Sequence, residues 1–289
     1  MYRIAILGCE NSHADAFLGF ILKDNKYPDI EVVGVYTDEE EAIKRMKDNF
    51  GVYCAKSFDE FVGKVDGVII TARDGKNHYK YAKPYIASGI PMFIDKPITS
   101  DEEEAVKFMK ELKAAGVRVT GGSICPHAQL VDDLSKIVKS ESEGRVYGGY
   151  LRGPVSMSNA YGNFFFYAQH VAEVTEKIFG YYPNSVKANV NANVNCVVVK
   201  YDNYDVNMTY VDGNYKYFAY VSADNGMIGG EYTLAGLSIL EMENFYDLLN
   251  GKEQKVSYRQ FIAPVFLMSA IERSINSGKE EAVHKIEEI

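Results

Sequence analysis

The first 120 residues alternate between short apolar runs and amphipathic segments, and this alternation limits the possible folds more than any other feature. Apolar runs at 2–7, 31–36, 68–70, 92–94 and 117–120 are predicted to be buried strands. The segment 14–22 repeats its apolar residues at helical spacing. Repeated strand–helix–strand units form a parallel sheet with helices on both faces. The sequence therefore predicts an N-terminal doubly wound α/β domain spanning 1–122.

Residues 123–289 show a different pattern. Helices are predicted at 129–139, 167–179, 244–249 and 265–277, with segments of period-two alternation between them. Asparagines at every second position from Asn189 to Asn195 are interpreted as the polar face of one strand. Asp224-Asn225-Gly226 is typical of a hairpin turn. We expect a second, α+β domain at 123–289 with a largely antiparallel sheet.

Charge and cysteine content exclude several classes of protein. The chain has 31 Lys and Arg against 40 Asp and Glu, a net charge of −9, which argues against a nucleic-acid or anionic-membrane partner. The cysteines Cys9, Cys54, Cys125 and Cys196 are scattered, as in proteins of a reducing compartment. With no export signal or membrane span in view, we expect a cytoplasmic protein. No His, Cys and carboxylate cluster has ligand spacing, so no metal site is expected.

The turn after the first strand lies where dinucleotide-binding folds carry the motif G-x-G-x-x-G. Here the sequence is Gly8-Cys9-Glu10-Asn11-Ser12-His13, and only the first glycine is kept. A side chain at the position of Glu10 crowds bound phosphates, and a carboxylate repels them. The motif alone therefore leaves two interpretations open, nucleotide binding and a strand–turn–helix that binds nothing.

The end of the second strand bears on the type of nucleotide. Asp38 is placed either to bind a ribose hydroxyl or to cap the following helix. The acidic run that continues through 39–41 would repel a 2′-phosphate, which favours NAD over NADP.

Two further side chains are candidates for chemistry. Lys96, in Asp95-Lys96-Pro97, follows a buried strand at the sheet edge where such folds bind ligands. His170 lies on a predicted helix and is suited to proton transfer near neutral pH. Taken singly, each has a plainer interpretation: Lys96 as a surface lysine and His170 as a histidine on the flank of a core helix.

Together these segments resemble the glucose–fructose oxidoreductase / inositol dehydrogenase / rhizopine-catabolism (Gfo/Idh/MocA) family. The resemblance runs through YRIAILGCENSHA, DGVIITARDGKNHYKYAKPYIASGIPMFIDKPIT, YAQHVAEVTEKIFGYYPNSVKA and the tail from MENFYDLLNGKE. It implies a Rossmann domain, then a substrate domain whose open sheet forms contacts in a homo-oligomer, a dimer or tetramer. It also implies a nicotinamide cofactor and hydride transfer to or from a sugar, cyclitol or related polyol.

The resemblance also assigns roles to residues. Lys96 would contact the nicotinamide and the reacting hydroxyl, and His170 would take or give the hydroxyl proton. Eight residues would line the cofactor: Gly8, Glu10, Asn11, Ser12, Thr71, Ala72, His78 and Asp95. Many members carry Asp four residues before the histidine, where this chain has Phe166, and Tyr167 or Glu173 is the conjectured substitute.

Two alternative functions remain open; the departures at Glu10, His13 and Phe166 motivate the first, and the second is implied by the resemblance. One is a non-catalytic sugar- or nucleotide-binding protein on the same fold. The other is a hydrolase or lyase that uses bound NAD for transient oxidation.

Overall fold

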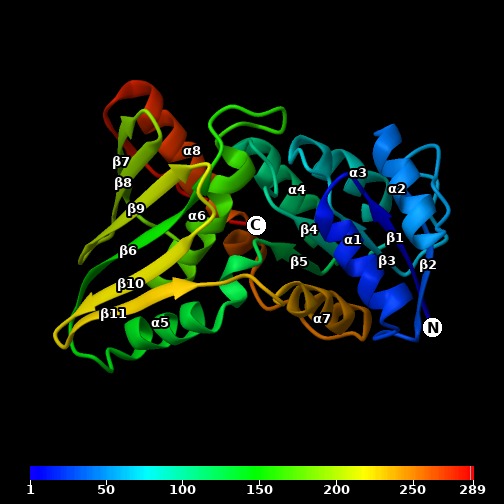
Figure 1. Ribbon diagram of the computed structural model, residues 1–289, viewed down its shortest axis with the longest axis horizontal. Helices are drawn as coiled ribbons and strands as arrows, with labels where there is room; N and C mark the ends of the chain where they lie inside the picture. Colours follow the sequence, from blue (N-terminus) through cyan, green and yellow to red (C-terminus); the bar gives the residue numbers. More distant parts are fainter. Residues whose placement is uncertain (287) are drawn as a thin grey trace.

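The computed structural model describes residues 1–286 and 288–289, and its first half is built on a parallel sheet (Figure 1). The strands are β1 (Tyr2–Leu7), β2 (Ile30–Tyr36), β3 (Gly67–Ile70), β4 (Met92–Asp95) and β5 (Val119–Gly122), in the order β2-β1-β3-β4-β5. Between them lie α1 (Ser12–Leu18) with the short π-helix η1 (Gly19–Lys23), α2 (Glu40–Phe50), α3 (Lys76–Ile86) and α4 (Glu102–Ala114). All neighbouring strands pair in parallel, so the predicted doubly wound fold is confirmed.

The second sheet has seven strands in the order β11-β10-β6-β9-β8-β7-β12. Its strands are β6 (Val146–Val155), β7 (Ser185–Asn191), β8 (Val194–Lys200), β9 (Asp205–Asp212), β10 (Tyr217–Ala223), β11 (Gly226–Tyr232) and β12 (Glu280–Ala282). Only β6 and β9 pair in parallel among the described strands of this sheet, so it is largely antiparallel, as predicted.

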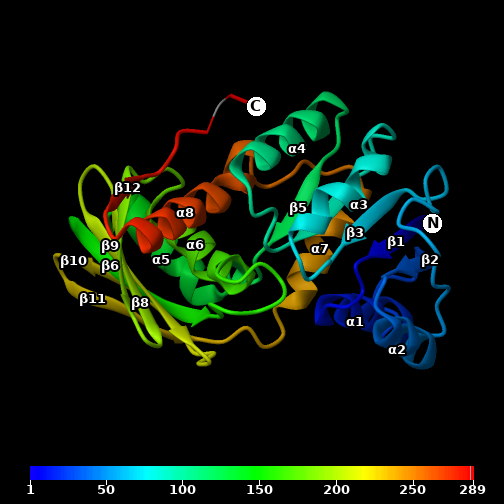
Figure 2. The same ribbon diagram turned by 90° about the horizontal axis from the view of Figure 1, so that it is seen from above.

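One face of the second sheet is covered by helices and the other is not (Figures 1 and 2). The covering helices are α5 (Gln129–Ser140), α6 (Phe165–Phe179) and α8 (Tyr258–Ser277), and the short η2 (Cys125–His127) leads into α5. Their apolar side chains and the inner side chains of the strands form one core. The opposite face is therefore open, as in the predicted architecture.

Two local predictions for this sheet have different outcomes. The hairpin at Asp224 and Asn225 is confirmed, because β10 pairs antiparallel with β11 directly across it. The single strand expected from Asn189 to Asn195 is wrong. The chain turns at residues 192–193, and Asn189 pairs with Cys196 across the β7–β8 hairpin. Alternation continued through the turn because asparagine suits turns as well as exposed strand positions.

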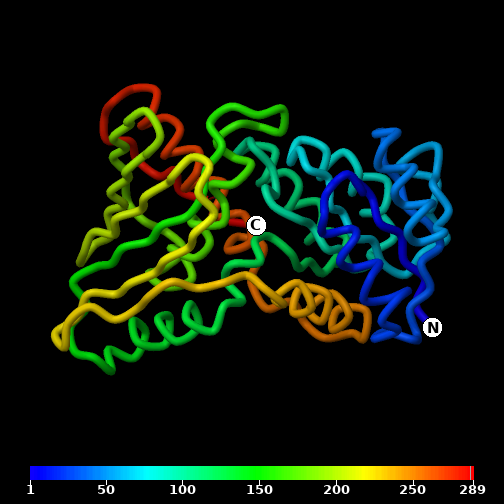
Figure 3. The backbone as a smooth tube through the Cα atoms, in the orientation of Figure 1, coloured from blue at the N-terminus to red at the C-terminus, as the bar shows by residue number. Residues whose placement is uncertain are grey.

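After β11 the chain returns to the first sheet, as the trace in Figure 3 shows. Helix α7 (Ser238–Leu249) packs against α1 and β5, and its Met242 and Phe245 join the core that includes Ile69 and Phe93. Helix α8 then contacts both α4 and α6. The division at 122/123 stays a prediction, and α7 lies on the first sheet although it follows the second sheet in sequence. No helix among the described residues has the length and apolar character needed to cross a membrane.

Candidate functional site

The residues predicted from the sequence meet at the carboxyl edge of the first sheet, where α6 faces it. The turn after β1 supplies Gly8 to Ser12, the end of β3 supplies Thr71 and Ala72, and β4 ends at Asp95. Strand order explains the meeting, because β1 lies between β2 and β3 and β4 follows β3. Carboxyl ends of neighbouring parallel strands share one edge, which is where ligands bind in such sheets.

Gly8 is required by the close approach of β1 and β3. Its φ of +84° lies in the left-handed region, and a Cβ added there would overlap the backbone of Ala72. Thr71 donates a hydrogen bond from Oγ1 to the Gly8 carbonyl at 2.9 Å and from its amide to Leu7 at 2.8 Å. Thr71 and Ala72 thus hold the turn from behind.

Glu10 crosses the end of β1 and joins its two neighbouring strands. Its side chain is 6% exposed, with Oε1 accepting from the Arg73 amide at 2.8 Å and Oε2 accepting from Thr37 Oγ1 at 3.1 Å. The Arg73 guanidinium donates to the Glu10 carbonyl and, at 2.8 Å, to Tyr161 Oη. The carboxylate therefore occupies donors at the ends of β2 and β3 that otherwise face a ligand.

Asp95 is the centre of a buried polar cluster beside this turn. Its Oδ2 accepts from Asn11 Nδ2 at 2.8 Å and lies 3.0 Å from Nδ1 of His13, and its Oδ1 accepts from the Lys96 amide at 2.7 Å. Burial acts to raise the pKa of Asp95, but His13 and Lys96 outweigh it and lower the pKa. Desolvation acts to lower the pKa of His13, but Asp95 raises it to about 9. At neutral pH the pair is therefore ionised, with His13 as a cation.

Two of the residues predicted to line the cofactor make hydrogen bonds within the protein. His78 is fully buried, and its Nε2 lies 2.8 Å from the Ala72 carbonyl. Burial lowers the pKa of His78 and keeps it neutral, so it holds the loop after β3 from the inside. Ser12 is exposed at the start of α1, and its Oγ donates to Asn11 Oδ1 at 3.4 Å.

Lys96 reaches from the end of β4 to the first turn of α6. Only 5% of it is exposed, and its Nζ donates to the Phe166 carbonyl at 3.3 Å while lying 4.5 Å from the centre of the Phe166 ring. Burial lowers the pKa of Lys96, although Asp95 opposes this. Phe166 thus meets the lysine through its carbonyl and through its ring face, which is a cation–π contact.

His170, one turn further along α6, is 5% exposed and has its Nδ1 2.7 Å from Ser123 Oγ. Burial, followed by the charges of Lys96 and His13, holds its pKa well below the usual value, so the imidazole is neutral at pH 7. Ser123 Oγ also accepts from the Cys125 amide at 3.1 Å, and the Ser123 amide donates to Glu173 Oε1 at 2.8 Å. Desolvation raises the pKa of Glu173 to about 7.

Tyr167 and Glu173, the conjectured substitutes for the missing aspartate, lie on different sides of His170. The Tyr167 ring is 6.0 Å from that of His170 and 5.5 Å from Lys96 Nζ. Glu173 instead bonds Ser123 and Gln169 behind the imidazole. Phe166 therefore has no carboxylate replacement in contact with Lys96 among the described residues.

Sequence reasoning missed two residues of this site. Ser123 follows β5 and orients His170, but a single serine after a strand carries no distinguishing signal. Glu241 comes from α7, 1% exposed, and neither carboxyl oxygen has a hydrogen-bond partner within the described structure. Burial raises its pKa to about 8, with His13 and Lys96 partly opposing. Its place in the site depends on α7 returning to the first sheet.

No group of three or more His, Cys, Asp or Glu side chains in the described part of the chain could hold a metal ion. The site brings together the buried Lys96 ammonium, the neutral His170 imidazole and the turn after β1.

Comparison with known proteins identifies the architecture. Residues 2–123 match the family described as "Oxidoreductase family, NAD-binding Rossmann fold", GFO_IDH_MocA. A comparison with curated protein sequences found no match.

Solved structures match over nearly the whole chain. GenD2 from gentamicin A biosynthesis, in complex with NAD, superposes with a TM-score of 0.84 at 14% identity, covering 98% of this chain and 97% of that one. For myo-inositol 2-dehydrogenase from Lactobacillus plantarum the values are 0.84 and 15%, with 98% and 99% covered. For scyllo-inositol dehydrogenase from Lactobacillus casei with NAD(H) and scyllo-inositol they are 0.83 and 13%, with the same coverage. At such identities these likenesses establish the fold. Residues 2–123 therefore match the NAD-binding Rossmann fold of the Gfo/Idh/MocA oxidoreductase family, and the solved structures extend the likeness in fold to nearly the whole chain.

Proposed function

We propose that the protein is an NAD-dependent dehydrogenase or reductase acting on a CH–OH carbon of a sugar, cyclitol or related polyol. The observation that carries this proposal is the burial of Lys96 and His170 beside each other at the carboxyl edge of the Rossmann sheet. An ammonium and a neutral imidazole suit a reaction in which a hydroxyl loses its proton as its carbon loses hydride. Inositol dehydrogenases among the structures of this fold support the substrate class.

The turn after β1 fits a dinucleotide at several positions but not at Glu10. Gly8 leaves room for the backbone to approach, and the cations His13 and Arg73 suit two linked phosphates. The carboxylate of Glu10 takes the Arg73 amide and the Thr37 hydroxyl, so a bound pyrophosphate must displace it or lie against a like charge. When bound, the nicotinamide supplies the hydride acceptor or donor.

His170 is the proposed general base and acid. The proposed tautomer has Nδ1–H donating to Ser123 Oγ, which leaves the lone pair of Nε2 for the substrate hydroxyl. The low pKa keeps this lone pair free well below neutral pH. Proton transfer of this kind contributes about 10²–10⁴-fold to the rate.

Lys96 is the proposed electrostatic partner of the substrate oxygen. Its ammonium is held by the Phe166 carbonyl and stabilised by the Asp95 carboxylate next to it in sequence. A buried cation aimed at an oxygen that gains negative charge lowers the barrier more than the same cation would in water. The Phe166 carbonyl and ring therefore hold the Lys96 ammonium in place.

NAD is the proposed cofactor rather than NADP. Asp38 is exposed at the end of β2, and Glu39, Glu40 and Glu41 follow it on the surface. Negative charge at this strand end favours a ribose with two free hydroxyls over a ribose 2′-phosphate.

The test combines binding with turnover. NAD and NADP are compared by thermal shift, and the better cofactor is then assayed with a panel of sugars and cyclitols by the absorbance of the reduced nicotinamide. Lys96→Met and His170→Gln should reduce turnover by about 10²–10⁴-fold while leaving the melting temperature near that of the wild type. His284→Gln, at an exposed histidine that bonds Glu102, is the control and should retain activity. Unchanged turnover in both site variants would refute the assignment.

A second function is favoured by the position of Glu10. A carboxylate that fills the phosphate site suits a protein that binds a sugar without redox chemistry. Such a protein would bind members of the sugar panel in calorimetry but give no change in nicotinamide absorbance. Sustained NAD-dependent oxidation of any polyol would exclude it.

We also propose a homo-oligomer joined through the open sheet face, and a cytoplasmic location. Tyr150, Val198, Phe218 and Tyr220 lie partly exposed on that face. The four cysteines are all free, as in a reducing compartment. Light scattering on the wild type and on Tyr220→Lys tests the oligomer, and a monomeric wild type would contradict it.

A further inference from the structure

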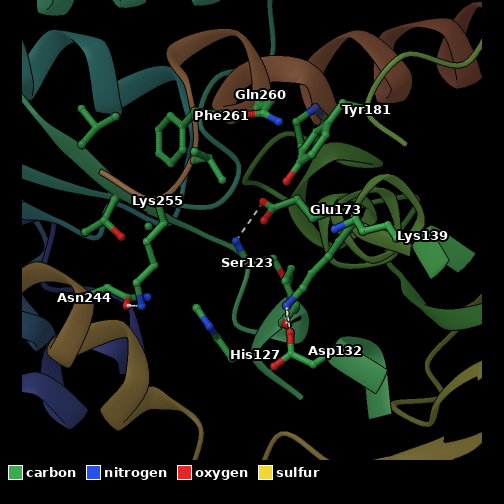
Figure 4. Close-up of a pocket in the computed structure, with 17 residues that line it drawn as sticks. Ser123, His127, Asp132, Lys139, Glu173, Tyr181, Asn244, Lys255, Gln260 and Phe261 are labelled. Carbon is green, nitrogen blue, oxygen red and sulfur yellow. Dashed lines mark hydrogen bonds and ion pairs between the residues drawn. The ribbon is translucent and has the colours of Figure 1, made fainter. Parts of the chain in front are cut away.

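A cavity lies between the two halves of the protein, behind the candidate site. Its volume is about 370 Å³, and it is lined by the edge strand β5, by α5 and α6, and by the segments at the end of α7 and the start of α8 (Figure 4). None of Glu10, Asn11, Lys96 or His170 is among the residues that line it. It shares Ser123 and Glu173 with the candidate site but otherwise has its own lining, and its volume is within the range of small-molecule pockets.

Three lysines line this cavity, although the protein as a whole is acidic. Lys139, Lys177 and Lys255 line it, while the chain as a whole carries a net charge of −9. Lys177 is neutralised by Asp132. Lys139 and Lys255 have no carboxylate partner among the described residues, and Lys255 Nζ donates to Asn244 Oδ1 at 2.5 Å. Two ammonium groups thus remain for an anion that enters.

His127 also lines the cavity, and the charges of two of these lysines affect its pKa. Burial first, and then the charges of Lys177 and Lys255, lower its pKa to about 4. Lys177 and Lys255 both act on this imidazole in the same direction, and Asp132 opposes them. An anion bound there would offset the lysines and raise this pKa.

The remaining polar groups suit hydroxyls. Gln260 uses its Oε1 to accept from Ser257, so its Nε2 amide is left as a donor. Tyr181 directs its hydroxyl toward Glu173 across the cavity in Figure 4. The Glu173 carboxyl accepts from the Ser123 amide with Oε1, and its second oxygen is an acceptor for a ligand hydroxyl.

We propose that this cavity binds a small polyhydroxylated anion, such as a sugar phosphate or a sugar acid. Its anionic group is attracted by Lys139 and Lys255, which line opposite sides of the cavity in Figure 4, and its hydroxyls meet Gln260, Tyr181 and Glu173. Because Ser123 lines the cavity and bonds His170, the occupant lies one residue behind the candidate base. Binding at this site does not depend on the proposed redox function.

Calorimetry without any nicotinamide tests the proposal. Glucose 6-phosphate and gluconate carry both an anionic group and several hydroxyls. They are compared with glucose, which has only the hydroxyls, and with inorganic phosphate, which has only the anionic group. We expect one of the two polyhydroxylated anions to bind at least about tenfold more tightly than glucose or phosphate. Which of them binds distinguishes a phosphate ester from a carboxylate.

Variants and histidine resonances then locate the site. Lys139→Gln and Lys255→Gln should each weaken binding about tenfold. Lys136→Gln, one turn earlier on α5 and outside the cavity, should not. By NMR, the ligand should raise the pKa of His127 and leave His284 unchanged.

Three results would overturn the proposal. The first is absence of binding by both polyhydroxylated anions at millimolar concentration. The second is inorganic phosphate binding as tightly as glucose 6-phosphate, which indicates a simple anion site. The third is a ligand that perturbs His13 and His170 but not His127, which places it at the β1 turn. These experiments contain no nicotinamide, so the proposed function is tested separately by NAD binding and turnover.

Discussion

Replacing Glu10 with glycine restores the second glycine of the dinucleotide motif and changes two quantities in opposite directions. The carboxylate accepts from the Arg73 amide and from Thr37 Oγ1, and both hydrogen bonds are lost. Two bonds at about 1 kcal/mol each, with about 0.5–1 kcal/mol for the more flexible glycine, predict a loss of about 2–3 kcal/mol in the free energy of unfolding. Urea unfolding of the unliganded protein measures this loss.

Affinity for NAD should rise in the same variant. A carboxylate about 5 Å from a phosphate repels it by about 3 kcal/mol at an effective dielectric constant near 20. Removing that charge, and the side chain that occupies the donors, predicts a dissociation constant about 100-fold lower. Calorimetry at fixed ionic strength measures it, because salt screens part of the repulsion.

Glu10→Gln separates charge from shape. Glutamine keeps the length and one acceptor oxygen, so it should show much of the gain in affinity with a smaller loss of stability. Glu272→Gln, with the same charge change at an exposed position on α8, should leave both quantities unchanged. If Glu10→Gly and Glu10→Gln both weaken NAD binding, Glu10 is a ligand of the cofactor and our reasoning about the turn is refuted.

Three further predictions test other parts of the structure. Gly8→Ala should destabilise the fold by about 2–4 kcal/mol in urea unfolding, because of left-handed backbone strain and overlap with Ala72. Gly19→Ala, in a helical turn with open space, is the control and should stabilise the fold by up to about 1 kcal/mol. Similar effects at both positions would contradict the argument that β1 and β3 approach closely at Gly8. Glu241→Gln should raise stability at pH 9 by about 3–4 kcal/mol and change it little at pH 5. The unfolded carboxyl loses its proton near the ordinary pKa of 4.5 and the folded carboxyl only near a pKa of about 8, so the stability of the wild type falls across the interval between these two values. Thermal melts at both pH values, with exposed Glu243→Gln as control, would show no pH dependence if the carboxyl were paired. Asp38→Asn should improve NADP binding relative to NAD by about tenfold in calorimetry, and an unchanged ratio would remove Asp38 from cofactor selection.

The fold could be predicted because its signals are local. A buried parallel strand must be apolar on both faces, and a covering helix must repeat its apolar residues every three to four positions. Residues 68–70 and 92–94 satisfy the first condition and lie in fully buried β3 and β4. The same reasoning gave a wrong prediction for Asn189–Asn195, because a polar residue at every second position is compatible with one strand or with two strands joined by a turn.

The candidate site could be predicted only where a side chain follows a strand end or belongs to a recognised motif. Lys96 and Gly8 meet that condition, and parallel pairing brings them to one edge. That Glu10 crowds a bound phosphate stays a prediction, and its bonds to Thr37 and Arg73 depend on the distances between three strand ends. No local pattern encodes those distances.

The sequence by itself determined the order of strands and helices, because burial on a sheet or along a helix leaves a periodic mark in the chain. Only the tertiary structure decided which distant groups share a site. Ser123 reaches His170 because β5 ends beside α6, and Glu241 is enclosed with Asp95 because α7 folds back over the first sheet. Hydrogen bonding and desolvation act through space, so the protonation states that set this chemistry follow from packing and not from neighbours in sequence.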